Sequence, residues 1–94
     1  MCGWTPLFIA SFHGHLEVVR ALLARGAVVD IAEYDGATPL FIASEKCHLE
    51  VVRELLAWGA SPGLAANGGA TALSRATAGG HAAIAQLLRA ALEA

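Results

Sequence analysis

The chain has 94 residues, of which 56% are hydrophobic and 15% are charged, and its formal net charge is −2 at pH 7. This balance provides no basic face for a phosphate backbone and no polybasic tail, so neither nucleic acid nor a membrane is an expected partner. The length leaves room for one small domain, and a surplus of acidic residues in the middle third favours a partner that carries positive charge.

The two cysteines, Cys2 and Cys47, have no metal-binding or paired spacing, which predicts free thiols in a reducing compartment. No apolar run has the length of a membrane-crossing helix, and repeat sequence follows Met1 directly in place of a signal peptide. Together these features predict a cytoplasmic or nuclear location.

A repeat with a period of 33 residues organises the sequence. Thr5, Thr38 and Thr71 are evenly spaced at this interval, and 18 of 23 positions are identical between residues 5–27 and 38–60. A third, diverged copy follows, as is usual for terminal repeats. Because each unit of such an array covers the apolar side of its neighbour, the period predicts a repeat solenoid. The helix signals within each unit, described below, make this an all-α repeat solenoid of stacked helix-turn-helix units.

We expect a single domain over residues 1–94, with repeats at about 1–32, 33–65 and 66–94. The first repeat lacks the turn residues that precede Thr38 in the second. Removal of an upstream repeat explains this better than a natural incomplete unit. The last repeat has no glycine after its final helix, so this helix is expected to run on and end the array.

Each repeat is expected to contain two helices. In the first repeat, Thr5 is placed to cap a helix that begins at Pro6, where the fixed φ of proline is already helical, and ends at His13. Gly14 supplies the left-handed residue that closes this helix. The second helix begins near His15. Its expected apolar stripe, at three- and four-residue spacing, consists of Leu16, Val18, Val19, Leu22 and Leu23.

Loops rich in turn-forming residues separate the helical pairs. Residues 28–36 and 61–69 lose the helical period and contain glycine with aspartate, asparagine or proline, so they are expected to project as hairpins or extended loops. Gly26 and Gly59 stand where a left-handed residue ends the second helix of each repeat.

One set of residues recurs in register across the copies; in the middle repeat it reads Gly36-Ala37-Thr38-Pro39-Leu40, Ala43, His48, Val51-Val52, Leu55-Leu56 and Gly59-Ala60. This set resembles the ankyrin repeat. The resemblance implies paired antiparallel helices, joined by outward-pointing, β-hairpin-like loops and stacked into a slightly curved solenoid with a concave face. It also implies a protein-binding module without catalytic chemistry.

Two departures from the family pattern carry structural predictions. The histidine usual after Thr-Pro-Leu is replaced by Phe8 and Phe41, whose rings are expected to stack between adjacent repeats. Cys47 stands where Gly14 and Gly80 close the first helix. We therefore expect a positive φ at this cysteine, at a cost on the order of 1 kcal/mol relative to glycine.

Histidine recurs once per repeat, as His15, His48 and His81, a pattern compatible with a metal ladder or a set of general bases. A structural role fits better, because an imidazole at the start of each second helix can bond neighbouring backbone groups and hold the turn. No carboxylate, cysteine or amide stands at a spacing that would complete a metal site or orient a nucleophile. No metal, cofactor or catalytic residue is therefore expected.

Positions that differ between otherwise identical repeats indicate a binding surface, because the shared repeat fold does not require the particular residues found there. Exposed aromatic residues at such positions are favourable anchors, although Trp4 and Phe12 can equally cover the end of the array. Trp58 lies away from the expected groove and is not one of the predicted binding residues. The predicted partner-binding residues are Trp4, Phe12, His13, Tyr34, Asp35, Glu45 and Lys46.

These observations favour a non-enzymatic module that binds a protein or peptide partner through the concave face. An alternative is a structural or targeting segment of a larger protein whose activity lies elsewhere. A further alternative is self-association through the exposed first repeat, which would give a homo-oligomer.

Overall fold

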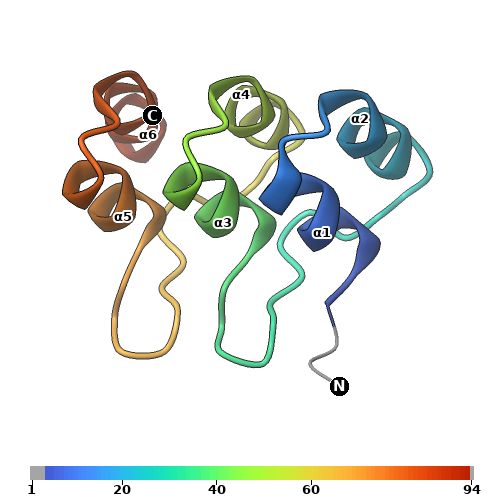
Figure 1. Cartoon of the computed structure of the whole chain (residues 1–94), viewed down its shortest axis with the longest axis horizontal. Coiled ribbons are helices and arrows are strands. Elements are labelled where there is room, and N and C mark those ends of the chain that lie inside the picture. The colour runs from blue at the N-terminus through green and yellow to red at the C-terminus, as the bar shows by residue number, and fades with distance from the viewer. Residues whose placement is uncertain (1–3, 94) are drawn as a thin grey trace.

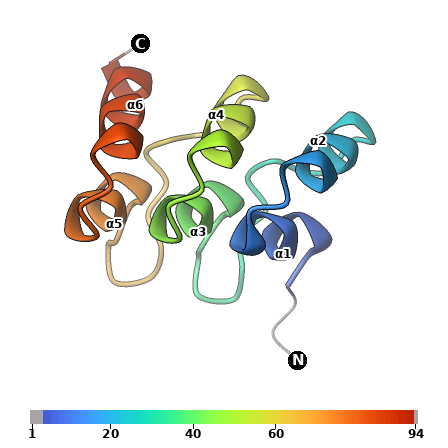
Figure 2. The same cartoon turned by 45° about the horizontal axis from the view of Figure 1, so that its top comes forward.

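The computed structural model describes residues 4–93, which form three stacked pairs of helices (Figure 1). The chain has the all-α repeat fold that the 33-residue period predicts, and both views separate the helices into two layers (Figure 1, Figure 2). One layer contains α1 (Pro6–His13), α3 (Pro39–Glu45) and α5 (Ala72–Ala78); the other contains α2 (Leu16–Ala24), α4 (Leu49–Ala57) and α6 (Ala82–Glu93).

A capping threonine precedes the first helix of each pair. Thr5 Oγ1 accepts a hydrogen bond from Phe8 N at 3.1 Å, and the equivalent bond in the second repeat is 3.2 Å long. In the third repeat Thr71 and Ser74 each accept from the backbone N–H of the other, which forms a capping box. The three threonines therefore occupy equivalent places, as predicted.

The hydrophobic core lies between the two layers and runs along the whole stack. Leu40 and Leu55 of the middle repeat are 1% and 0% exposed, and Ile84 and Leu88 continue the core into α6. The last helix runs on for 12 residues, against nine in α2 and α4, which confirms its predicted extension.

The predicted apolar stripe of the first repeat is wrong at Val18. Its side chain is 48% exposed, whereas the equivalent Val51 is 1% exposed. Ile9 and its equivalent Ile42 show the same contrast, at 41% and 7%. In the second repeat these side chains lie against the preceding repeat, so the corresponding positions of the first repeat form an apolar end face of the described stack.

The loops between repeats form hairpin-like turns, as predicted. Glu33 N donates to Ala37 O at 2.8 Å, and Gly36 adopts a φ of 86° at the turn. The second loop repeats this geometry, and Asn67 N donates to Asp35 O at 2.7 Å. This bond joins the two hairpins, which project side by side below the helices (Figure 1). Apart from one isolated bridge, residues 4–93 contain no β-structure.

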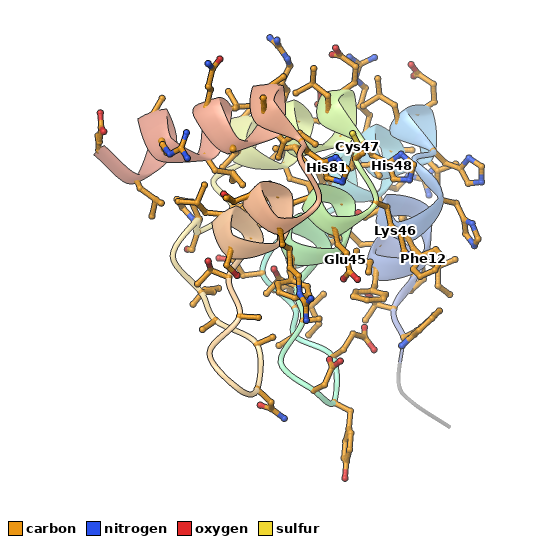
Figure 3. All side chains as sticks on the ribbon, turned by 60° about the vertical axis from the view of Figure 1, so that its left-hand side comes forward. Phe12, Glu45, Lys46, Cys47, His48 and His81 are labelled. Carbon is orange, nitrogen blue, oxygen red and sulfur yellow. The ribbon has the colours of Figure 1, made fainter. Side chains whose placement is uncertain are left out.

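The recurring histidines tie each repeat to the one before it. Nε2 of His48 lies 2.9 Å from Phe12 O, and Nε2 of His81 lies 3.3 Å from Glu45 O. Both rings point toward the preceding first helix (Figure 3). The predicted bonding to the backbone is confirmed for His48 and His81, and the acceptor in each case lies in the last turn of the first helix of the preceding repeat. The ring of His15 instead stacks on another imidazole, 5.7 Å away between centroids.

Cys47 closes α3 with a φ of 64°, which confirms the predicted left-handed backbone. The thiol is exposed and free, and Cys2 lies outside the described residues. Gly14 and Gly80 have nearly the same φ, at 73° and 74°. The middle repeat therefore uses the same turn with a less suitable residue.

Replacing Cys47 by glycine is expected to raise the free energy of unfolding by about 1 kcal/mol, because glycine adopts positive φ without a Cβ clash. Cys47→Ala is the matched control, since it removes the thiol and keeps the strained Cβ. Denaturant titrations of the three proteins check this. Equal stability of the glycine and alanine variants would contradict it.

Phe8 and Phe41 are both buried, in a second apolar cluster beside the first helices. The predicted stacking of the Phe8 and Phe41 rings on each other is not among the aromatic ring pairs found within residues 4–93. The ring of Phe8 packs against Trp4, with centroids 5.1 Å apart, and the guanidinium carbon of Arg75 lies 5.8 Å from the centroid of Phe41. Phe8 and Phe41 thus share one buried cluster, and the ring pairings found for them are with Trp4 and Arg75.

A surface network joins α2 to α4. Arg20 Nε lies 3.1 Å from Glu54 Oε1, and Trp58 Nε1 donates to the other oxygen of Glu54 at 3.0 Å. Arg20 also pairs with Glu17 at 3.0 Å. The hydrogen bond from Arg20, followed by that from Trp58, holds the pKa of Glu54 below its ordinary value.

Glu54→Gln is expected to lower the melting temperature at neutral pH and not at strongly acid pH. The carboxylate of Glu54 has a lower pKa in the folded chain, so it stabilises the fold above its unfolded pKa, and this contribution disappears as the pH falls through the folded pKa. Salt should reduce the difference, because the pair is at the surface. Thermal melts at both pH values check this. A difference that persists in acid would contradict it.

Candidate functional site

A groove of about 260 Å³ lies between α1, α3 and the hairpin that leads into α3. Five of the seven predicted partner-binding residues line it: Trp4, Phe12, Tyr34, Asp35 and Glu45. We call it the hairpin groove. Its remaining lining residues are Phe8, Glu33, Ala37, Phe41 and Ile42.

Aromatic rings form one wall of the hairpin groove. The Trp4 centroid lies 5.1 Å from that of Phe8 and 5.7 Å from that of Phe12. Phe8 is fully buried, Phe12 is half-buried and Trp4 is 44% exposed, so the wall grades from the core to the surface. The helical spacing of Phe8 and Phe12 places both rings on one face of α1. The aromatic wall is therefore anchored by the buried Phe8 side chain and the α1 helix.

The other two predicted residues, His13 and Lys46, stand at the rim. Lys46 Nζ lies 4.7 Å from the centroid of Phe12, and the ring of His13 lies 4.9 Å from the same ring, edge to face. Phe12 and Glu45 come from the last turns of α1 and α3, which are adjacent in the stack, and Lys46 directly follows α3 (Figure 3). The structure thus brings the seven residues around one depression.

Glu33 is the one charged lining residue that was not predicted from the sequence. Its side chain is 7% exposed, and its Oε2 accepts a long hydrogen bond of 3.4 Å from Thr5 N. Oε1 is buried and has no hydrogen-bond partner within residues 4–93. The acidic excess of the middle repeat was the only sequence signal that pointed toward Glu33, because the burial of this residue depends on the neighbouring repeat.

A hydrogen bond within the turn stabilises the hairpin that borders the groove. Asp35 Oδ1 accepts from Ala37 N at 3.1 Å, which fixes the turn residue against the start of α3. Tyr34 next to it is 93% exposed, so its ring is free to meet a partner. Phe8 and Phe41 were predicted as packing residues, and they also form part of the lining.

Within residues 4–93, no group of three or more His, Cys, Asp or Glu side chains is placed to hold a metal ion. No helix in the same range is long and apolar enough to cross a bilayer. The features that distinguish the hairpin groove are its exposed aromatic rings and its carboxylates, which suit recognition of another molecule.

Comparison with known proteins agrees with the geometry. A family model described as ankyrin repeats, in three copies, matches residues 1–66 and again residues 35–93. The chain is also similar to a curated ankyrin repeat-containing protein of the yeast Saccharomyces cerevisiae, with 58% identity over 33 residues. That stretch covers 35% of this chain and 6% of the yeast protein, so the similarity extends over a small part of that protein's length.

Proposed function

The chain belongs to the ankyrin repeat family, and from this premise we propose that it is a non-enzymatic module that holds a protein or peptide partner in the hairpin groove. Ankyrin repeats are generally protein-interaction modules. The observation that carries the proposal is that several side chains which differ between otherwise identical repeats, those of Trp4, Phe12, His13, Glu45 and Lys46, gather in or beside one groove. A shared frame with variable side chains on one face is an arrangement suited to recognition.

The groove is well prepared for binding because its walls are ordered before a partner arrives. Trp4 and Phe12 already pack on each other, and the His48 bond to Phe12 O fixes the turn behind them. Side chains that are held in this way lose less conformational entropy on binding. Tyrosine and tryptophan also provide large contact areas for few rotatable bonds.

Selection of short peptides from a random library on the immobilised chain tests the proposal. Combined alanine substitution of Tyr34, Glu45 and Lys46 is expected to weaken selected peptides by about tenfold or more, and to leave the melting temperature unchanged, because all three side chains are exposed. Trp58→Ala is the matched control, an exposed aromatic outside the groove. Failure to select peptides, or selected peptides that ignore the triple variant, would refute the proposal.

Self-association through the first repeat is a second candidate, favoured by the apolar end face. Val18 and Ile9 are exposed there, although their equivalents in the second repeat are covered. A second copy placed on this face would bury the same kinds of side chain that adjacent repeats bury. A depression of about 250 Å³ in this region is lined by Thr5, Pro6, Leu7, Leu22, Ala27, Val28 and Ile31.

Light scattering of the isolated chain at two concentrations tests this second candidate. A mass that rises toward that of a dimer, and that returns to the monomer value in Val18→Glu, would support it. Val51 is no suitable control, because it is buried, so Glu17→Ala serves as the neighbouring exposed change. A monomeric mass at both concentrations would exclude it.

A further inference from the structure

The carboxylate of Glu33, a lining residue of the hairpin groove, has one buried oxygen without a hydrogen-bond partner among the described residues. The residue is 7% exposed, and Oε1 has no hydrogen-bond partner among the described residues, while Oε2 receives only the 3.4 Å bond from Thr5 N. A buried acceptor without a donor is unfavourable, and native structures rarely leave one without a reason. Glu33 is among the lining residues, but Oε1 itself is buried, so a donor from an occupant of the groove reaches it only when the carboxylate turns toward the groove.

The charge around the groove selects for a cationic occupant. Its lining includes three carboxylates, from Glu33, Asp35 and Glu45, and no lysine or arginine. Two cations stand near it, Lys46 over Phe12 and Arg75 over Phe41, but neither is among the residues of the lining. The ion pairs found within residues 4–93 do not include Glu33.

The aromatic wall provides the second requirement for a cation. The faces of aromatic rings attract ammonium and guanidinium groups. Two lining rings already do so within the chain: Lys46 Nζ is 4.7 Å from the centroid of Phe12, and Arg75 is 5.8 Å from that of Phe41. Trp4, the more exposed neighbour of Phe12, has no such cation within residues 4–93 and remains 44% exposed.

We propose that the hairpin groove receives an arginine side chain of the partner, with its planar face against Trp4 and with its guanidinium donating to Glu33 Oε1 once this carboxylate turns toward the groove. This inference rests on the proposed function and specifies the chemistry of the partner. Arginine suits the site better than lysine, because a planar group with several N–H donors can bond a carboxylate and stack on a ring at the same time.

Fluorescence of Trp4 provides a direct test in a Trp58→Phe background, where Trp4 is the remaining tryptophan. The probes are Nα-acetyl-arginine amide and its uncharged counterpart Nα-acetyl-citrulline amide. The arginine probe is expected to change the Trp4 emission saturably, and the citrulline probe is not. Glu33→Gln should weaken the arginine response by about tenfold, because a charge-assisted hydrogen bond is lost. Glu54→Gln, a carboxylate outside the groove, should leave it unchanged.

A second variant keeps the test decisive if Glu33→Gln is poorly folded. Phe12→Ala removes part of the wall without touching the carboxylate, and it should also weaken the arginine response. Circular dichroism melts establish which variants are folded. Equal responses to arginine and citrulline, or an arginine response that survives in a folded Glu33→Gln protein, would overturn the inference.

The peptide selection separates this inference from the proposed function. Selected peptides that share an arginine, and that lose binding when citrulline replaces it, would support both. Selected peptides that depend on Tyr34, Glu45 and Lys46 but have no arginine, or that accept lysine equally well, would overturn the arginine assignment and leave the proposed function standing. Absence of any selected peptide would count against both.

Discussion

Replacing Leu55 by alanine is expected to lower the free energy of unfolding by about 2–5 kcal/mol, which is the range for removing a fully buried leucine. Leu55 is 0% exposed and lies in α4, in the middle of the continuous core. A domain of this size is stabilised by only about 5–15 kcal/mol, so the variant should lie close to the limit of folding. Urea titrations followed by circular dichroism measure the change.

The matched control for this substitution is Leu22→Ala. Leu22 occupies the same position in the first repeat, one period earlier, but its side chain is only half-buried. Less apolar surface and a smaller cavity are involved, so the cost should be clearly lower than at Leu55. Equal costs at the two positions would show that the end face of the first repeat is covered in solution.

Gly14→Ala is expected to destabilise the fold by about 2–4 kcal/mol, the sum of backbone strain and of a steric clash. Gly14 has a φ of 73°, which L-residues rarely adopt. A Cβ on this glycine would also lie 2.6 Å from Nδ1 of His48, the ring that bonds to Phe12 O. The substitution therefore disturbs the turn of one repeat and its link to the next.

Gly80→Ala separates the two contributions. Gly80 has nearly the same φ, 74°, but nothing lies within 4 Å of the position that its Cβ would take. Only the strain remains there, so a cost of about 1–2 kcal/mol is expected. Chemical denaturation of both variants gives the comparison. A cost at Gly14 no larger than at Gly80 would mean that the His48 ring moves away without loss of stability.

Features that depend on local sequence were predictable for this fold. A threonine cap needs only the residues of the first turn, and the left-handed φ of Cys47 follows from its alignment with Gly14. The 33-residue period also predicts that the helices of each repeat pack against the equivalent helices of the next repeat. Val18 was mispredicted because its burial depends on a neighbour: identical sequence places Val51 in the core and Val18 at the surface.

The candidate site shows the same division. Comparison of the repeats selected Phe12, Glu45 and Lys46, because their positions vary while the frame does not. Glu33 was not predicted as a site residue, since nothing in the sequence of its hairpin indicates that the carboxylate is buried beside Thr5 of the preceding repeat. Ring partners were equally out of reach: Phe8 packs on Trp4, a residue whose equivalent in the next repeat is an alanine.

The histidine bonds also bear on how this chain unfolds. Phe12 O and Glu45 O lie in the last turns of α1 and α3, where carbonyls lack partners in their own helix, and the imidazole of the following repeat bonds them. The last carbonyls of each of these helices are thus hydrogen-bonded by a histidine of the next repeat. Unfolding of one repeat would therefore leave the last carbonyls of the preceding first helix without these partners, and we expect neighbouring repeats to unfold cooperatively for this reason.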